Sequence, residues 1–202
     1  MKKELVNWLI NLWCKPDDKL NGGETAIIML GYGLTCKRKL PKTEISVLEI
    51  VLELWYNKNE IPIIWASQNY LFRESKKIED QLKIAYLEKN YVLAKYIWPS
   101  KNGIKHTKEE VKAIVTALEE KGFDFEQAVI VVCDRCHRRE VEKILKKFPK
   151  LKRKFQTVKG VWDKDHYLWY SRSQTRWLLS RILSYYFPWI TELIAKMMRK
   201  TS

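Results

Sequence analysis

The stretch "CDRCH" at 133–137 combines thiols, a carboxylate and an imidazole, which could bind a metal, exchange electrons or move a proton. A Cys-x-x-Cys-His motif can attach c-type haem, but this requires export, and the chain shows no other haem-ligand pattern. Zinc needs four ligands, and no second pair of ligand residues has suitable spacing, so we predict no metal. A redox dithiol of Cys133 and Cys136 stays open, because nearby arginines lower a thiol pKa.

A further interpretation treats the same stretch as a loop between a strand and a helix. The run 128–134 is apolar and β-branched, and a helical pattern follows it. Cys133 then ends a buried strand as a small apolar residue. The loop presents side chains to a ligand at the end of a sheet: Asp134, His137, Arg138 and Arg139. In this interpretation, which we favour, His137 binds the ligand or moves a proton, and Asp134 orients a histidine.

The elements that would position this loop follow from hydrophobic patterning. Apolar runs bounded by turn residues predict five strands, at 25–33, 61–69, 92–98, 128–134 and 155–162. Helical patterns lie between them, at roughly 42–58, 74–90, 107–121 and 136–148. This alternation predicts a Rossmann-like α/β three-layer sandwich with a mostly parallel sheet of about five strands. We expect one domain, with a helical segment at 1–24, a core at 25–170 and terminal helices at 171–202.

Two other loops follow predicted strands. Gly31 and Gly33 come after the first strand, where their amides could approach a phosphate, although a plain turn explains them equally well. The turn lacks the third glycine of the dinucleotide fingerprint, and the second strand ends without an acidic residue, so NAD and FAD are not expected. Ser67 follows that second strand and offers a hydroxyl to the same edge.

The stretch "HTKEE" at 106–110 opens a predicted helix. Thr107 and Glu110 have the spacing of a capping box, which is sufficient to explain both residues. His106 and Glu109 are not explained by that cap. We therefore treat His106 as a candidate for contacting an anionic ligand and Glu109 as a carboxylate that could orient a histidine.

The formal net charge of +14 on 202 residues favours polyanionic partners: nucleic acid, anionic lipid or phosphorylated metabolites. The segment 138–154 holds nine basic and two acidic residues, although a solvated helix face explains this as well. The nine tryptophans do not interleave with this segment, so nucleic acid is the least favoured partner.

Four cysteines without a cleavable signal peptide indicate a reducing compartment, so we expect a cytoplasmic protein. The N-terminal apolar stretch is about eleven residues long, too short to span a bilayer. The segment 176–200 is apolar and aromatic with basic flanks. It fits a terminal helix packed on the sheet, or a helix bound to an anionic membrane surface, which is our alternative function.

Taken in order, the loops resemble those of the YdcF/SanA/ElyC-like family of bacterial proteins. The resemblance covers about 25–187 and rests on "LGYG" (30–33), "SQN" (67–69), Glu74 or Glu79, "KHTKEE" (105–110), "CDRCH" (133–137) and the tail "WLLSRILSYYF". Only Ser67 remains of a Ser-Gly-Gly motif, and Glu140 stands where the family has an arginine, one position after Arg139.

The resemblance implies a Rossmann-like domain with a polar pocket at the strand ends. One family member is reported to bind S-adenosylmethionine, and others act in envelope and peptidoglycan precursor biology. We therefore expect an anionic small molecule as ligand: a nucleotide, an S-adenosylmethionine-like compound or a phosphorylated envelope precursor. Gly31, Gly33, Ser67, Thr107, Arg138 and Arg139 would bind it, and His106, Glu109, Asp134 and His137 would supply any catalysis. The reaction itself is left open.

Overall fold

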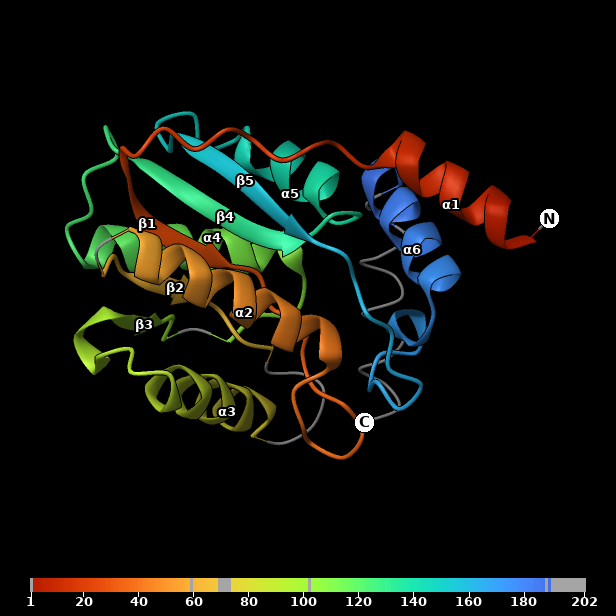
Figure 1. Cartoon of the computed structure of the whole chain (residues 1–202), viewed down its shortest axis with the longest axis horizontal. Helices are drawn as coiled ribbons and strands as arrows, with labels where there is room; N and C mark the ends of the chain where they lie inside the picture. The colour runs from red at the N-terminus through yellow and green to blue at the C-terminus, as the bar shows by residue number, and fades with distance from the viewer. Residues whose placement is uncertain (1, 59, 69–73, 102, 188, 190–202) are drawn as a thin grey trace.

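The computed structural model (Figure 1) describes residues 2–58, 60–68, 74–101, 103–187 and 189. Its strands are β1 (Glu24–Met29), β2 (Ile63–Trp65), β3 (Ile97–Pro99), β4 (Ala128–Asp134) and β5 (Arg153–Val158). Its α-helices are α1 (Lys2–Trp13), α2 (Lys42–Asn57), α3 (Ser75–Lys89), α4 (Thr107–Glu120), α5 (Arg138–Leu145) and α6 (Gln174–Tyr186). The five strands form one parallel sheet in the order β3-β2-β1-β4-β5. The predicted α/β class is confirmed.

The central strands are apolar throughout because both faces of the sheet are covered. In β4, every residue after Ala128 is buried. The edge strand β3 is only half-buried and much shorter than the predicted 92–98, because residues 94–96 form a 3₁₀ turn before it. The last strand runs from Arg153 to Val158, slightly earlier than the predicted 155–162.

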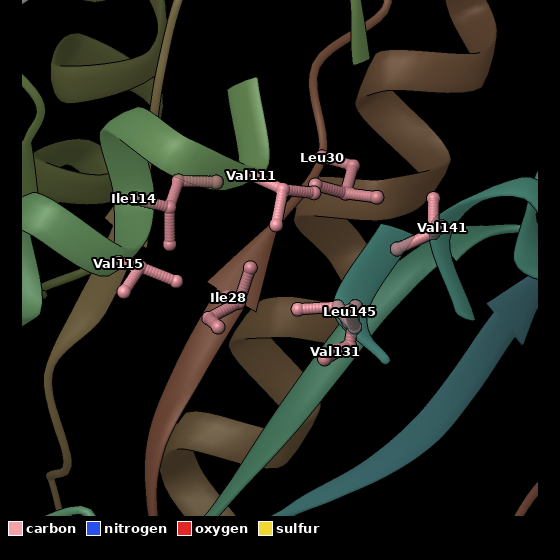
Figure 2. A pocket seen from close by; sticks show the side chains of 8 residues that line it. All are labelled: Ile28, Leu30, Val111, Ile114, Val115, Val131, Val141 and Leu145. Atoms are coloured by element: carbon pink, nitrogen blue, oxygen red, sulfur yellow. The ribbon is translucent and has the colours of Figure 1, made fainter. Parts of the chain in front are cut away.

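Helices cover the sheet on both sides, which gives three layers (Figure 1). Ile27 and Met29 of β1 pack with residues of α2 and α3, whereas Ile28 packs with residues of α4 and α5. Figure 2 shows the side of the sheet that α4 and α5 cover. A cavity of about 10 Å³ lies there between β1, β4, α4 and α5. Its lining is aliphatic: Ile28, Leu30, Val111, Ile114, Val115, Val131, Val141 and Leu145. A cavity of this size and lining is a packing gap and not a ligand site.

The N-terminal segment joins the edge of the sheet and the terminal helix. The backbone N–H of Asp18 donates to Phe155 O at 2.9 Å, and Phe155 N–H donates to Asp18 Oδ2 at 2.8 Å. These bonds occupy part of the outer edge of β5, which would otherwise offer unpaired backbone groups. The ring of Trp13 packs edge-on against Tyr185 of α6, with centroids 5.5 Å apart.

The strand order places the topological switch point between β1 and β4. From β1 the chain builds outward through β2 and β3, and it then returns to β4 on the other side. In such sheets, ligands bind beyond the carboxyl ends of the strands at this point. The loops after β1 and β4 meet at this point.

Candidate site at the carboxyl edge of the sheet

A single side-chain hydrogen bond joins the starts of two helices, α4 and α5, near the switch point. Thr107 Oγ1 at the start of α4 lies 3.0 Å from His137 Nε2, just before α5, and both groups are buried. Glu140 Oε2 lies 3.5 Å from the same Nε2 and accepts a 2.8 Å hydrogen bond from Arg181 Nη1 of α6. We call these four residues, Thr107, His137, Glu140 and Arg181, the histidine cluster.

The imidazole of His137 is neutral at pH 7. Burial lowers its pKa well below the ordinary value, and the positive charge of Arg181 lowers it further. Its Nδ1 is buried and has no hydrogen-bond partner within the described residues. A neutral imidazole with one nitrogen bonded to Thr107 and the other unpartnered can exchange a proton or a hydrogen bond with a ligand.

The carboxylate of Asp134 has a different task from the one predicted. Asp134 Oδ1 accepts hydrogen bonds from Trp177 Nε1 at 2.8 Å and from Cys136 N–H at 2.9 Å. Its backbone N–H donates to the hydroxyl of Tyr32. Burial raises the pKa of Asp134, opposed by the Trp177 hydrogen bond. The side chain thus holds α6 against the β4 loop, and the carboxylate that faces the ring of His137 is Glu140.

The start of α4 differs from the predicted capping box. His106 is the capping residue, and its Nδ1 accepts the backbone N–H of Glu109 at 3.3 Å. Glu109 reaches back to the N–H of Lys105 at 2.8 Å, and its other oxygen lies 3.5 Å from His106 Nε2. The predicted box of Thr107 and Glu110 is wrong, because both side chains turn into the interior. The histidine that Glu109 approaches is His106, and whether Glu109 orients a histidine stays a prediction.

A second polar cluster lies beside the first, under the β1 turn. We call Glu44, Glu79, Lys83 and Glu110 the charge cluster; all four are buried. Lys83 Nζ lies 2.6 Å from Glu79 Oε1 and 3.0 Å from Glu44 Oε1. Our site residues did not include this cluster. The i, i+4 spacing of Glu79 and Lys83 was visible in the sequence, but the same spacing is common on exposed helix faces.

The charge cluster occupies the amides of the glycine turn. Gly31 N–H donates to Glu110 Oε1 at 2.7 Å, and Tyr32 N–H donates to Glu44 Oε2 at 2.6 Å. A Cβ on Gly31 would come within 3.0 Å of Glu79 and of Lys83, so glycine provides the room for the cluster. Gly33 has φ +75°, a conformation that favours glycine. Carboxylates of the chain itself thus fill the place predicted for a phosphate.

Burial and charge act against each other within this cluster. Burial raises the pKa of Glu110 to about 8, although the Gly31 amide and Lys83 oppose the rise. Burial also raises the pKa of Glu44, against the pull of Lys83. Burial alone would lower the pKa of Lys83, but Glu44 and Glu79 outweigh it and raise that pKa. At neutral pH the cluster therefore holds a charged ammonium, and Glu110 is largely protonated.

The end of β2 supplies further polar atoms to this edge. Ser67 is fully buried, and its Oγ has no hydrogen-bond partner within the described residues. The same holds for Gln68 Oε1, while Gln68 N–H donates to Glu79 Oε2 at 3.1 Å. Because buried polar atoms are nearly always paired, these two oxygens have partners that the described residues do not supply.

The two candidate arginines bind the N-terminal segment. Arg138 pairs with Asp18 Oδ1 at 2.7 Å, donates to Pro16 O and stacks over the ring of Phe155. Arg139 donates to Trp13 O and lies over the ring of Trp13. The structure thus places both guanidinium groups against 13–18 and the start of β5, where they hold this segment.

Comparisons of the chain with protein-family models, with curated proteins and with solved structures found no match. Within the part of the chain that the structure describes, no three His, Cys, Asp or Glu side chains are arranged to hold a metal ion. The same residues include no helix both long and apolar enough to cross a membrane. The site must therefore be interpreted from its own chemistry.

Proposed function

We propose that the protein binds an anionic small molecule beside the histidine cluster, at the carboxyl edge between β1 and β4. The hydrogen bond between Thr107 and His137 carries this proposal, because it brings the N-termini of α4 and α5 together. Helix N-termini present free N–H groups and partial positive charge, and Arg181 lies beside them as a cation paired with Glu140. Anions are stabilised in such surroundings.

The β4 side of the edge is a better place for the anion than the glycine turn. The amides of Gly31 and Tyr32 are already occupied by carboxyl groups of the charge cluster, which a phosphate would have to displace. His106 and Glu109 are 30% and 44% exposed at their side chains. They form the outer part of the site, through which a ligand would reach His137.

The geometry suggests a role for each residue. Thr107 holds Nε2 of His137, which leaves Nδ1 to meet a ligand group or to take its proton. Glu140 keeps Arg181 beside the imidazole. By resemblance, the ligand classes are nucleotides, S-adenosylmethionine-like compounds and phosphorylated envelope precursors. Membership of the YdcF/SanA/ElyC-like family and a role in envelope metabolism belong to this proposal.

A thermal-shift screen of the full chain tests the proposal. The panel comprises nucleotides, S-adenosylmethionine, sugar phosphates and polyprenyl-phosphate analogues. A ligand at a hundred times its Kd adds about 2.7 kcal/mol of stability, which corresponds to roughly 5–10 °C in Tm for a chain of this size. His137→Ala should abolish the shift, whereas Lys108→Ala, at an exposed position of α4, should retain it. An unchanged response in His137→Ala would remove the histidine cluster from the site.

A second candidate function is binding to an anionic membrane surface. About half of the segment predicted for this role, 176–200, lies outside the described residues, but α1 provides a separate observation. Leu5, Trp8 and Leu12 follow one face of the helix and are 57%, 59% and 64% exposed. Such a face, next to cations, is typical of a helix that lies in the lipid interface.

Cations lie near the end of this helix, where Arg139 donates to Trp13 O and Lys15 pairs with Glu142. A surface cleft of about 50 Å³ is lined by Lys15, Arg139, Glu142, Lys143, Lys146 and Tyr185. Flotation with vesicles of anionic or neutral lipid tests this function. Binding should require anionic lipid, weaken with salt and decrease in Trp8→Ala. Equal recovery of Trp8→Ala and the wild type would exclude α1 as the contact.

A further inference from the structure

Two cysteines far apart in the sequence meet beside the candidate site. Cys14 Sγ, one residue after α1, lies 3.6 Å from Cys136 Sγ, in the loop between β4 and α5. The Cys-x-x-Cys spacing had suggested a different pair, Cys133 with Cys136. These two pack into the hydrophobic cores on opposite faces of the sheet, so the sheet itself separates their side chains.

The backbone on each side of the close pair is fixed by hydrogen bonds. Trp13 Nε1 donates to Cys136 O at 2.8 Å, and Arg139 donates to Trp13 O. Cys136 N–H donates to Asp134 Oδ1 at 2.9 Å. A disulfide has its sulfurs about 2.05 Å apart, so the two thiols need to approach each other by only about 1.5 Å. A small rotation of the side chains can provide this.

The two thiols differ in reactivity. The hydrogen bond from Cys136 lowers the pKa of Cys14, and the positive charges of Arg135 and Arg139 add to the effect. The same hydrogen bond and burial raise the pKa of Cys136. Cys14 is half-buried, whereas Cys136 is only 2% exposed. Cys14 is therefore the thiol that an external reagent meets first.

We propose that Cys14 and Cys136 form a dithiol site that reduces small-molecule disulfides and becomes an intramolecular disulfide. The Cys14 thiolate attacks one sulfur of the small disulfide, which breaks its S–S bond and releases the first small thiol. Cys136 then loses its proton and attacks Cys14 Sγ in the mixed disulfide, which releases the second small thiol. The protein loses two electrons and two protons, and the small disulfide gains both.

The product would tie α1 to the loop that precedes His137. The other two thiols lack these conditions. Cys133 is fully buried in β4, and burial raises its pKa well above the ordinary value. Cys36 is exposed and has Arg172 Nη2 at 3.8 Å, but no second thiol. The inference stands on the two sulfur positions and is independent of the proposed ligand.

The experiment exposes the folded full chain to oxidised glutathione and follows it by intact mass and peptide mapping. In the wild type, Cys14 and Cys136 should together lose two hydrogens and yield a linked peptide that contains both, whatever adduct forms on the exposed Cys36. Cys136→Ser should stop at a glutathione adduct on Cys14, and Cys14→Ser should give no internal bridge. Cys36→Ser, the matched control, should react like the wild type.

Two kinds of outcome would overturn the proposal. The first is a wild-type chain that accumulates a stable glutathione adduct on Cys14 and does not resolve it. The second is a bridge from Cys133 to Cys136, or a Cys14 and a Cys136 that both stay unreacted after the exposed Cys36 has been titrated. Circular dichroism of each variant checks that a variant without the disulfide is still folded. In denaturant, the selectivity for this pair should fall at least about tenfold, because it depends on the folded geometry.

Discussion

Replacing Glu110 with glutamine should make the free energy of unfolding less dependent on pH, because it removes the ionisation of one buried carboxyl group. In the folded state, the Glu110 carboxyl is buried beside two other carboxyl groups, and its pKa is about 8 instead of 4.5. Glutamine has nearly the shape of the protonated acid, and its oxygen can still accept the Gly31 N–H. It cannot ionise, so the cost of placing a charge at this position disappears.

The sign and size of the effect follow from the two pKa values. Because the folded state binds the proton more tightly, the stabilisation is fully present below pH 4.5 and is lost as pH rises through about 8. From well below pH 4.5 to well above pH 8 the lost stabilisation amounts to about 5 kcal/mol, since each unit of pKa difference is worth about 1.4 kcal/mol. Between pH 6 and pH 9 the wild type should lose roughly 3 kcal/mol through this group alone.

Urea unfolding at pH 6 and pH 9 measures this difference. Glu110→Gln should match the wild type at pH 6 within about 1 kcal/mol and exceed it by roughly 3 kcal/mol at pH 9. Burial also raises the pKa of Glu140, but this group acts in both proteins and cancels in the comparison. Glu119→Gln, at an exposed position of the same helix, should follow the wild type. Parallel curves for Glu110→Gln and the wild type would refute a buried, protonated Glu110.

Three other substitutions test the polar contacts at the carboxyl edge. Lys83→Met should cost about 3–5 kcal/mol in chemical unfolding, because it leaves the buried carboxylates without their cation, whereas Lys77→Met on the exposed face of α3 should cost less than about 0.5 kcal/mol. Trp177→Phe should cost about 1–3 kcal/mol, since Asp134 loses an indole donor; a change near zero would mean that water replaces it. Gly160→Ala should lower Tm, because its Cβ would lie 2.5 Å from Asp134 Oδ2, and an unchanged Tm would contradict this close packing.

The fold could be predicted because the hydrophobic pattern of its central elements fits only one kind of secondary structure. The run at β4 is apolar without alternation, which fits only a strand covered on both faces, and its predicted bounds 128–134 agree with the structure. The helix predicted at 42–58 spans 42–57 for a similar reason, since its apolar residues recur at helical spacing. The edge strand β3 was placed poorly, because a half-buried edge imposes less pattern on its residues.

The candidate site could be predicted only in part. His137 and Thr107 were nominated because they follow strands of a parallel sheet, and the structure joins them by a hydrogen bond. Lys83 was missed, because a lysine buried by tertiary packing has the same local sequence as one on a surface. The helix is capped by His106 and not by Thr107 for a related reason. The side chain of Thr107 bonds to His137 in the interior, and the local sequence does not reveal this partner.

Histidine NMR tests the central claim most directly, because the chain has only three histidines: His106, His137 and His166. A ligand from the screen is titrated into protein labelled with ¹⁵N-histidine, with signals assigned from single His→Gln variants. His166 bonds to Tyr32 O and to the N–H of Leu168, so it is an internal reference. Our account predicts that the His137 and His106 signals move with the ligand while that of His166 stays in place. Saturable binding that shifts only His166, or none of the three, would contradict it.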